Sequence, residues 1–193
     1  MTSGNDPSPL LKTSTPEWVV LVDAEDRELG EMEKMEAHEK GLLHRAFSVF
    51  LVNDAGQLLL QQRAWSKYHS GGLWTNTCCS HPRPGESVEA AAARRLMEEM
   101  GMRCDLSPAF HFVYRSALDH GLVEHELDHV FIGRSSAVPV VNPEEVAGYR
   151  YAHWHEVERE MAEGPERFTV WFQICFAEVR KRMEGVAAGR PWG

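Results

Sequence analysis

The stretch Glu86–Met102, E-S-V-E-A-A-A-A-R-R-L-M-E-E-M-G-M, decides the fold of this 193-residue chain. It predicts a helix that begins after the N-cap Ser87 and runs to about Met100, because a serine at that position caps free backbone N–H groups and Gly101 provides a natural stop. Four charged residues lie near the end of this helix: Arg94, Arg95, Glu98 and Glu99. They form either exposed pairs at i,i+4 spacing or a helix end that handles pyrophosphate and metal.

The same stretch resembles the Nudix signature, G-x5-E-x7-R-E-U-x-E-E-x-G-U with U aliphatic. The matching residues are Glu86, Arg94, Leu96, Glu98, Glu99, Gly101 and Met102. Two positions depart from it: Ser80 stands in place of the first glycine, and Arg95 stands in place of a glutamate. That glutamate helps to hold the hydrolytic metals in Nudix hydrolases, whereas an arginine repels Mg²⁺ and attracts a phosphate oxygen. The chain therefore resembles a Nudix fold diverted from hydrolysis.

Directly before the helix, Trp74–Pro82 carries Cys79 and His81 at a spacing of two. On an extended backbone such residues point to the same face, so a thiol and a metal-binding imidazole would line one cavity. Cys78 points to the opposite face. The alternative interpretation is a buried cysteine beside a capping histidine.

Beyond the helix, Glu124, Glu126 and Asp128 alternate along a predicted strand and share one face. Three carboxylates on one face repel one another unless solvent, a cation or protonation relieves them. The segment is therefore either a solvated edge strand or part of a divalent metal site. His38 and His44 are either structural residues or two further neutral imidazole ligands.

The rest of the chain predicts an α+β fold, a Nudix-type sandwich of mixed or antiparallel sheets flanked by helices. A charged stretch over 24–41 is expected to be irregular, and a closing helix is expected from Pro165 to about Met183, before Gly185. The expected strands are 17–23, 44–52, 57–62, 73–79, 109–118, 122–133 and 148–154.

Composition limits the class of protein. The formal net charge is −9, with 43% hydrophobic and 25% charged residues, which argues against a broad basic surface for nucleic acid. No apolar run approaches the ~20 residues that span a bilayer. We expect a polar, disordered leader over 1–16, one domain over 17–185 and a short tail over 186–193. Because the leader lacks an apolar signal core, a cytoplasmic location is expected.

Three segments together are specific enough to identify a family: Gly41–Ser48, Thr75–Pro82 and Glu124-x-Glu126. The chain resembles the type I isopentenyl-diphosphate isomerases over roughly Val19 to Arg182. The resemblance implies interconversion of isopentenyl and dimethylallyl diphosphate through a carbocation-like state. It implies a small isoprenoid diphosphate as the partner, and it predicts no nucleic acid, no membrane span and no particular oligomeric state. The loop His69–Gly72 departs from the family's commoner aromatic or Phe-Pro-Gly form.

The resemblance also implies roles for single residues. Cys79 and Glu126 become the catalytic acid/base pair. The implied ligands of one Mg²⁺, Mn²⁺ or Zn²⁺ ion are His38, His44, His81, Glu124 and Glu126. Glu99 is implied to hold a second Mg²⁺ that arrives with the diphosphate. The implied diphosphate contacts are Lys34, Arg63, Lys67 and Arg95, and the implied aromatic residues at the isoprenoid end are Tyr114 and Trp171.

The chemistry requires such groups. A bare alkene is a poor base, so protonating it needs a strong acid and the exclusion of water. A carboxyl group that shares an oxygen with a metal is more acidic than a free one, and a thiol can serve the opposite face. The alternatives are a Nudix hydrolase of a diphosphate substrate and a non-catalytic metal-binding or interaction module.

Overall fold

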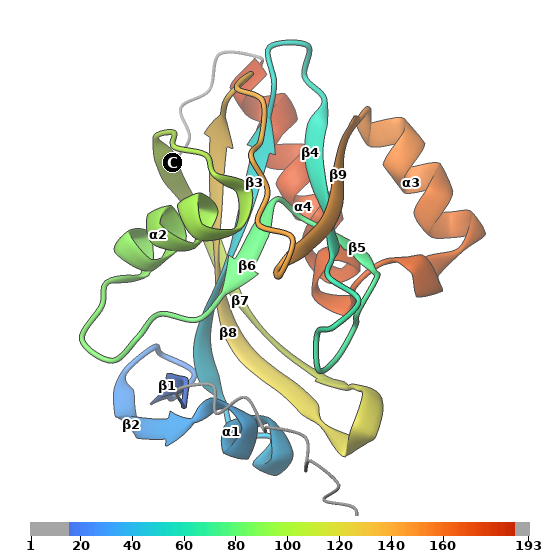
Figure 1. The fold of residues 1–193 in the computed structure, drawn as a ribbon. Coiled ribbons are helices and arrows are strands. Elements are labelled where there is room, and N and C mark those ends of the chain that lie inside the picture. The colour runs from blue at the N-terminus through green and yellow to red at the C-terminus, as the bar shows by residue number, and fades with distance from the viewer. Residues whose placement is uncertain (1–15, 188–193) are drawn as a thin grey trace, which may run out of the picture.

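A computed structural model describes residues 16–187, which form a mixed sheet with helices on both faces (Figure 1). The strands are β1 (Trp18–Val22), β2 (Glu28–Glu33), β3 (His44–Val52), β4 (Leu58–Arg63), β5 (Trp74–Thr75), β6 (Cys78–Ser80), β7 (Leu106–Ala117), β8 (Val123–Arg134) and β9 (Val146–Ala152). The helices are α1 (Lys34–Lys40), α2 (Val88–Met100), α3 (Trp154–Glu163) and α4 (Val170–Ala187), with short 3₁₀ turns η1 (Asp119–Gly121) and η2 (Pro165–Arg167). This is the α+β fold that the sequence predicts.

Strand β3 organises the sheet, because it pairs with four other strands. It runs antiparallel to β1, β4 and β6 and parallel to β8, with β7 beyond β8 and β9 beyond β4. The parallel register joins His44 to Glu126 and continues without a break to Val52 and Arg134. A strand from the first half of the chain and one from the second half therefore lie side by side.

Alternating residues of β3 face two separate cores, as the period of two requires. Phe47, Val49 and Leu51 pack with Ala91 and other residues of α2 on one face. The opposite face of the sheet packs against α4 and α3. That second core includes Phe50, Val52, Phe172, Phe176 and Val157. These two hydrophobic layers make the sandwich, and a third, smaller cluster of Val20, Val22 and Leu127 joins β1 to β8.

Helix α2 confirms the prediction at both ends. The Ser87 hydroxyl accepts a hydrogen bond from the backbone N–H of Ala90 at 3.2 Å, and Gly101 adopts the left-handed conformation (φ 63°) that ends the helix. A side chain at Gly101 would also collide with the Val140 carbonyl oxygen, 2.5 Å from where its Cβ would be. Glycine is therefore required there for two independent reasons.

The predictions for the charged stretch and for both ends of the closing helix are wrong, and one helix was not predicted. The charged stretch 24–41 is ordered as β2 and α1. Helix α1 has no apolar periodicity that would predict it, but Glu33 caps its start by accepting a hydrogen bond from the Glu36 backbone N–H at 2.9 Å. Helix α3 was not predicted. The expected strand 148–154 overlaps its first residue, because β9 ends at Ala152 and α3 begins at Trp154. Pro165 begins η2, not the closing helix, and α4 continues past Gly185.

The domain boundaries stay predictions. Residues 1–15 of the expected leader and residues 188–193 of the expected tail lie outside the described residues. Among residues 16–187, no helix is both long and apolar enough to cross a membrane.

Candidate active site

Five side chains from four segments converge below the sheet: His38 of α1, His44 at the start of β3, His81 just after β6, and Glu124 and Glu126 of β8. One ligand atom from each lies within 4.8 Å of all the others. The parallel pairing of His44 with Glu126 and the alternation of Glu124 and Glu126 along β8 bring these residues together. We call this group the His/Glu cluster. It brings together the five ligands that the sequence analysis predicts for one metal.

The contacts within the His/Glu cluster are short and buried. The Nε2 atoms of His44 and His81 are 3.2 Å apart, and His81 Nε2 is 2.9 Å from Glu126 Oε1. His38 Nε2 is 3.3 Å from Glu124 Oε2. Both carboxylates are buried, so the interpretation of this segment as a solvated edge strand is wrong: β8 lies between β3 and β7.

The histidine rings are oriented by backbone carbonyl groups. The Nδ1–H of His38 donates to the Lys34 carbonyl oxygen at 2.6 Å, and the Nδ1–H of His44 donates to that of Leu42 at 2.8 Å. Their Nε2 lone pairs therefore point into the cluster, which is how metal-binding histidines are usually held. His38 Nε2 and Glu124 Oε2 are buried without any hydrogen-bond partner. A divalent cation would satisfy both atoms, so these residues fit a metal ion.

Burial sets the protonation of the cluster. It lowers the pKa of His81 from 6.5 to about 3 and lowers the pKa of His38, so both rings stay neutral and able to bind metal. Burial, together with the neighbouring charge of Glu126, raises the pKa of Glu124 well above its usual range. Burial acts in the same direction on Glu126, but its contacts with His44 and His81 outweigh it and hold the pKa of Glu126 well below the usual range.

A small inner cavity of about 70 Å³ adjoins the cluster. Its walls include Cys79, Glu126, Tyr114, Trp171 and Arg63. The Tyr114 hydroxyl donates to Glu126 Oε2 at 2.7 Å. Burial raises the pKa of Cys79 to about 12, despite the opposing effect of Arg63, so the thiol keeps its proton at neutral pH.

The two adjacent cysteines point to opposite faces, as the period of two predicts. Cys79 borders the inner cavity and packs against the core beneath α4. Cys78 is fully buried in the other core, with Ala91 and Ala92 of α2. Of this pair, only Cys79 therefore reaches the cluster's side of the sheet.

Three of the four cations predicted to bind diphosphate are already paired with carboxylates at the rim of the inner cavity. Lys34 donates to Glu17 at 2.6 Å, and Lys67 donates to Glu145. Arg95 donates to Glu99 at 2.6 Å and lies 3.3 Å from Glu145. We call these three cations and their acidic partners the paired rim, which comprises Lys34, Lys67, Arg95, Glu17, Glu99 and Glu145.

Two predicted residues lie differently from the others. Glu99 is outside the His/Glu cluster and does not line the inner cavity; it also accepts a hydrogen bond from Gln61 at 3.0 Å. Arg63 has no carboxylate partner among the described residues, and donates instead to the carbonyl oxygens of Ser70 and His69, at 3.2 Å each. Its guanidinium group lies 5.2 Å from the Trp171 ring centre.

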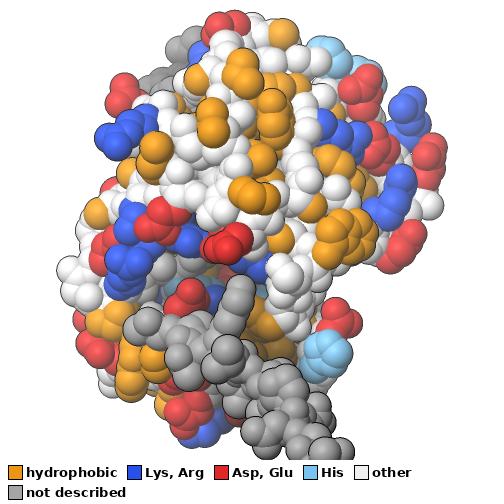
Figure 2. All heavy atoms as spheres, in the orientation of Figure 1, with side chains coloured by type: hydrophobic (Ala, Val, Ile, Leu, Met, Phe, Trp, Pro, Cys, Tyr) orange, Lys and Arg blue, Asp and Glu red, His pale blue; other side chains and the backbone are white. Residues whose placement is uncertain are grey.

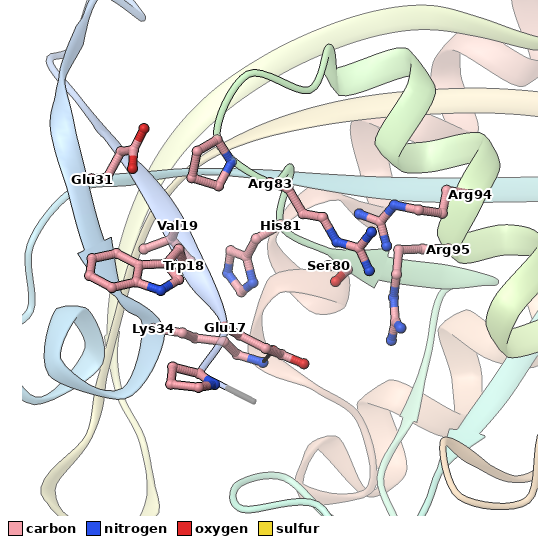
Figure 3. Close-up of a pocket in the computed structure, with 12 residues that line it drawn as sticks. Glu17, Trp18, Val19, Glu31, Lys34, Ser80, His81, Arg83, Arg94 and Arg95 are labelled. Carbon is pink, nitrogen blue, oxygen red and sulfur yellow. Dashed lines mark hydrogen bonds and ion pairs between the residues drawn. The ribbon is translucent and has the colours of Figure 1, made fainter. Parts of the chain in front are cut away.

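An outer cavity of about 650 Å³ lies beyond the rim, between β1–β2 and the start of α2. Figure 3 shows Arg83, Arg94 and Arg95 on one side of it and Trp18 and Glu31 on the other, with His81 between them. In the space-filling view, basic and acidic side chains gather around the hollow below α2 (Figure 2). The outer and inner cavities share five wall residues: Glu17, Lys34, Ser80, His81 and Arg95.

Four residues of the site were not assigned a role from the sequence: Glu17, Tyr68, His69 and Glu145. Two of them, Tyr68 and His69, directly follow Lys67, which was predicted to bind diphosphate. A histidine beside such a residue, in a loop with two glycines, could have been predicted to lie at the site. Glu17 and Glu145 come from distant segments without any motif, and only the folded chain brings them to Lys34 and Lys67.

Comparison with known proteins gives a consistent result. The family model for the NUDIX domain matches residues 42–172. A Pectobacterium atrosepticum protein named isopentenyl-diphosphate Delta-isomerase is 58% identical over 161 residues, covering 83% of this chain and 90% of the relative. A Burkholderia multivorans protein of the same name is 51% identical over 162 residues, covering 84% and 92%.

Solved structures share the fold at low identity. The Deinococcus radiodurans protein DR0079 superposes with a TM-score of 0.69 at 22% identity, covering 86% of this chain and 99% of its own. A MutT NUDIX hydrolase from Burkholderia pseudomallei has a TM-score of 0.58 at 20% identity, covering 71% and 98%. These likenesses concern the fold alone.

Proposed function

The chain belongs to the isopentenyl-diphosphate Delta-isomerase family, built on the NUDIX domain, and we propose that Cys79 and Glu126 perform its reaction as a two-sided acid/base pair. The enzyme interconverts isopentenyl and dimethylallyl diphosphate. This requires one proton to be delivered to the terminal alkene carbon and another to be removed from the methylene carbon on the other side of the branched carbon.

One observation carries the proposal: Cys79 and Glu126, from different segments of the chain, both border the small inner cavity. Burial keeps the proton on the Cys79 thiol, whereas Glu126, whose pKa is lowered, gives up a proton far more readily. Two groups that can each give or take a proton therefore face the same small cavity. The cavity's size also limits the water that could trap a carbocation.

The proton balance follows from that arrangement. The donor's bond to hydrogen breaks as a C–H bond forms at the alkene, which leaves positive charge on the branched carbon. The acceptor then takes a proton from the neighbouring methylene carbon, and that electron pair becomes the new double bond. In the reverse direction the two residues exchange roles. The aromatic ring of Trp171 lies in the cavity wall, where a π face can favour a neighbouring positive charge.

A divalent metal is the second part of the proposal. The His/Glu cluster would hold it through three imidazoles and two carboxylates, a donor set compatible with Mg²⁺, Mn²⁺ or Zn²⁺. When bound, the ion would supply positive charge that makes a carboxyl group at Glu126 a stronger acid. The hydrogen bond from Tyr114 holds the other oxygen of Glu126.

The paired rim is proposed to bind the diphosphate. Lys34, Lys67 and Arg95 border the inner cavity beside Arg63, so a diphosphate placed among them would exchange with their present acidic partners. We propose Glu99 as the carboxylate for a second Mg²⁺ that arrives with the diphosphate, which requires Arg95 to leave Glu99 for a phosphate oxygen. Binding energy far from the alkene would then position the reacting carbons.

The test is incubation of isopentenyl diphosphate with the purified protein and Mg²⁺ or Mn²⁺ in D₂O, followed by NMR. We expect dimethylallyl diphosphate to form with deuterium in one methyl group and, after repeated reversal, at the vinyl carbon, in the wild type and in Cys78→Ala but not in Cys79→Ala. Release of inorganic phosphate or pyrophosphate without isomerisation would favour the hydrolase alternative. An active Cys79→Ala variant would contradict the acid/base assignment.

We also propose a cytoplasmic location and one domain over 17–185. The polar composition of the leader supports the first, and the continuous sheet from β1 to β9 supports the second. Cell fractionation and limited proteolysis test them, with release of a fragment inside 17–185 as the contradicting result.

A further inference from the structure

His69 contacts the His/Glu cluster without belonging to it. The residue lies in the loop between β4 and β5 and is only 4% exposed. Its Nε2 is 3.2 Å from Glu124 Oε1, and its Nδ1 is 3.2 Å from the Ser70 hydroxyl oxygen. The ring also packs edge-on against Tyr68, with ring centres 4.4 Å apart.

When a bound metal keeps Glu124 ionised, these two contacts decide which ring nitrogen of His69 carries the proton. A carboxylate that binds a metal is ionised and can only accept a hydrogen bond. Nε2 must therefore carry the hydrogen that faces Glu124, because a lone pair there would repel the carboxylate oxygen. Nδ1 is then an acceptor, and the Ser70 hydroxyl can donate to it. The three groups form one directional chain from Ser70 through His69 to Glu124.

The loop backbone is fixed in the conformation that this chain of hydrogen bonds needs. Arg63 binds the carbonyl oxygens of both His69 and Ser70. Ser70 adopts φ 51°, which is unfavourable for a residue with a side chain, and Gly72 lies so close beneath the Trp65 ring that a Cβ would be 2.2 Å from a ring carbon. Such a conformation persists only where its surroundings enforce it.

The two oxygens of Glu124 consequently have different surroundings. Oε1 faces His69, whereas Oε2 faces His38 Nε2 and has no hydrogen-bond partner. Holding Oε1 fixes the rotation of the carboxylate and presents Oε2 to the centre of the cluster. An outer hydrogen-bond partner of this kind typically contributes 10–100-fold to metal affinity or activity.

We propose that His69 is a positioning residue that donates its Nε2–H to Glu124 and orients this carboxylate for a divalent cation. The inference rests on the proposed metal site, but its test does not depend on isomerase activity. If His69 has this role, the metal affinity depends on more than the five cluster residues. It also depends on the loop between β4 and β5, which Arg63 holds through its backbone carbonyl groups.

The experiment compares His69→Leu, which removes the donor, with His69→Gln, which keeps an N–H group at similar reach. Mn²⁺ affinity is measured by chelator competition, with the exposed His155 as the matched control in His155→Leu. We expect His69→Leu to lose about tenfold to a hundredfold in affinity. His69→Gln should recover most of that loss, Ser70→Ala should show a smaller loss, and His155→Leu should match the wild type.

Two further measurements keep the outcome decisive. Thermal unfolding of each metal-free variant shows whether a lower Mn²⁺ affinity results from a less stable fold. If a His69 variant unfolds at a clearly lower temperature than the wild type, the Mn²⁺ affinity of Ser70→Ala is compared with the wild type instead. Nitrogen couplings in the Mn²⁺ EPR spectrum should be the same in the wild type and His69→Gln. Equal Mn²⁺ affinity in His69→Leu and wild type would overturn the proposal, and so would loss of one bound nitrogen in His69→Gln, since His69 would then be a ligand. Failure of the wild type itself to bind Mn²⁺ would instead count against the proposed metal site.

Discussion

The His/Glu cluster and the paired rim lie side by side but are built in opposite ways. In the cluster, imidazole and carboxylate atoms face one another, and His38 Nε2 and Glu124 Oε2 have no partner. In the rim, Lys34, Lys67 and Arg95 each have a carboxylate partner. The donor set of the cluster therefore suits a cation, whereas the rim has neutralised its own charge and must exchange partners to accept an anion.

The difference means that the two proposed ion sites would bind by different routes. A buried polar atom without a partner is costly, so filling the cluster stabilises the fold. The rim pairs differ in strength because their exposure differs: the Glu17 side chain is 69% exposed, and that of Glu99 is 5% exposed. Exposed pairs contribute little, so Glu17 is expected to release its lysine first.

The largest expected effect is a loss of turnover on changing Cys79, in the wall of the inner cavity beside the His/Glu cluster. Cys79→Ala should reduce turnover by ~10²–10⁴-fold or more, because general acid–base catalysis contributes about that much. Metal content and thermal stability should remain, since the thiol is not a cluster ligand. Cys78→Ala, on the neighbouring residue, is the control and should change only packing. Glu126→Gln should also stop turnover, with some loss of metal. Normal rates in Cys79→Ala and none in Cys78→Ala would reverse the face assignment.

Metal content separates the two regions next. His81→Ala or Glu124→Gln should lose most of the roughly one ion per chain that we expect to survive dialysis, because each removes a cluster ligand. Arg95→Ala in the rim should keep it. Elemental analysis after dialysis measures this, and unchanged metal in His81→Ala would remove His81 from the ligand set.

The pH dependence of stability should distinguish them as well. The pKa of His81 is about 3 in the folded protein and 6.5 in the unfolded chain, so between these values the unfolded chain binds a proton that the folded one does not. The metal-free protein should therefore lose stability as the pH falls from about 6.5 toward 3. The lowered pKa values of Glu17 and Glu145 affect stability at lower pH, below the usual glutamate value of 4.5. Urea unfolding of wild type and His81→Gln across this range is the measurement, and an identical decline above pH 4.5 would contradict it.

A smaller effect is expected from the rim. Arg95→Ala should raise the KM for isopentenyl diphosphate about tenfold at low salt, since a hydrogen bond to a charged group is worth ~1.5–3 kcal/mol. The same change should leave metal affinity unaltered. Arg95→Glu restores the Nudix signature at this position and should weaken binding further. An unchanged KM in Arg95→Ala would make this arginine only a partner of Glu98 and Glu99.

The smallest effect should come from the most exposed rim pair. Glu17→Gln should lower the KM by no more than about fivefold, because it frees Lys34 from a pair worth ~0–1 kcal/mol. Glu31→Gln is the matched control, since this exposed glutamate borders the outer cavity. A higher KM in Glu17→Gln would mean that Glu17 holds Lys34 in place for the substrate.

Spacing alone predicted which neighbours in the cluster share a face, and the reason is local geometry. The full ligand set and the four diphosphate cations were implied only by the family resemblance. Cys79, His81, Glu124 and Glu126 lie at spacings of two, so an extended backbone alone places each pair on one face. The capped helix α2 was predictable from Ser87 and Gly101 for the same local reason.

Other features depend on contacts that no short spacing encodes. Helix α1, which carries His38, has only two buried residues and no apolar period. Whether Glu124 lies on an edge or a central strand depends on β3 and β7 pairing with β8 from both sides. Glu145 meets Lys67 only after β9 has joined β4.

The parallel pairing of β3 with β8 also has a consequence for folding kinetics. His44 and Glu126 become neighbours only when two strands that are distant in the chain align. Such non-local pairing forms slowly, because the chain loses the entropy of loop closure before the stabilising contacts form. A metal ion therefore meets a complete ligand set only late in folding. Added metal should slow unfolding much more than it speeds refolding. A metal-loaded chain would then be kinetically stable because its unfolding rate is low.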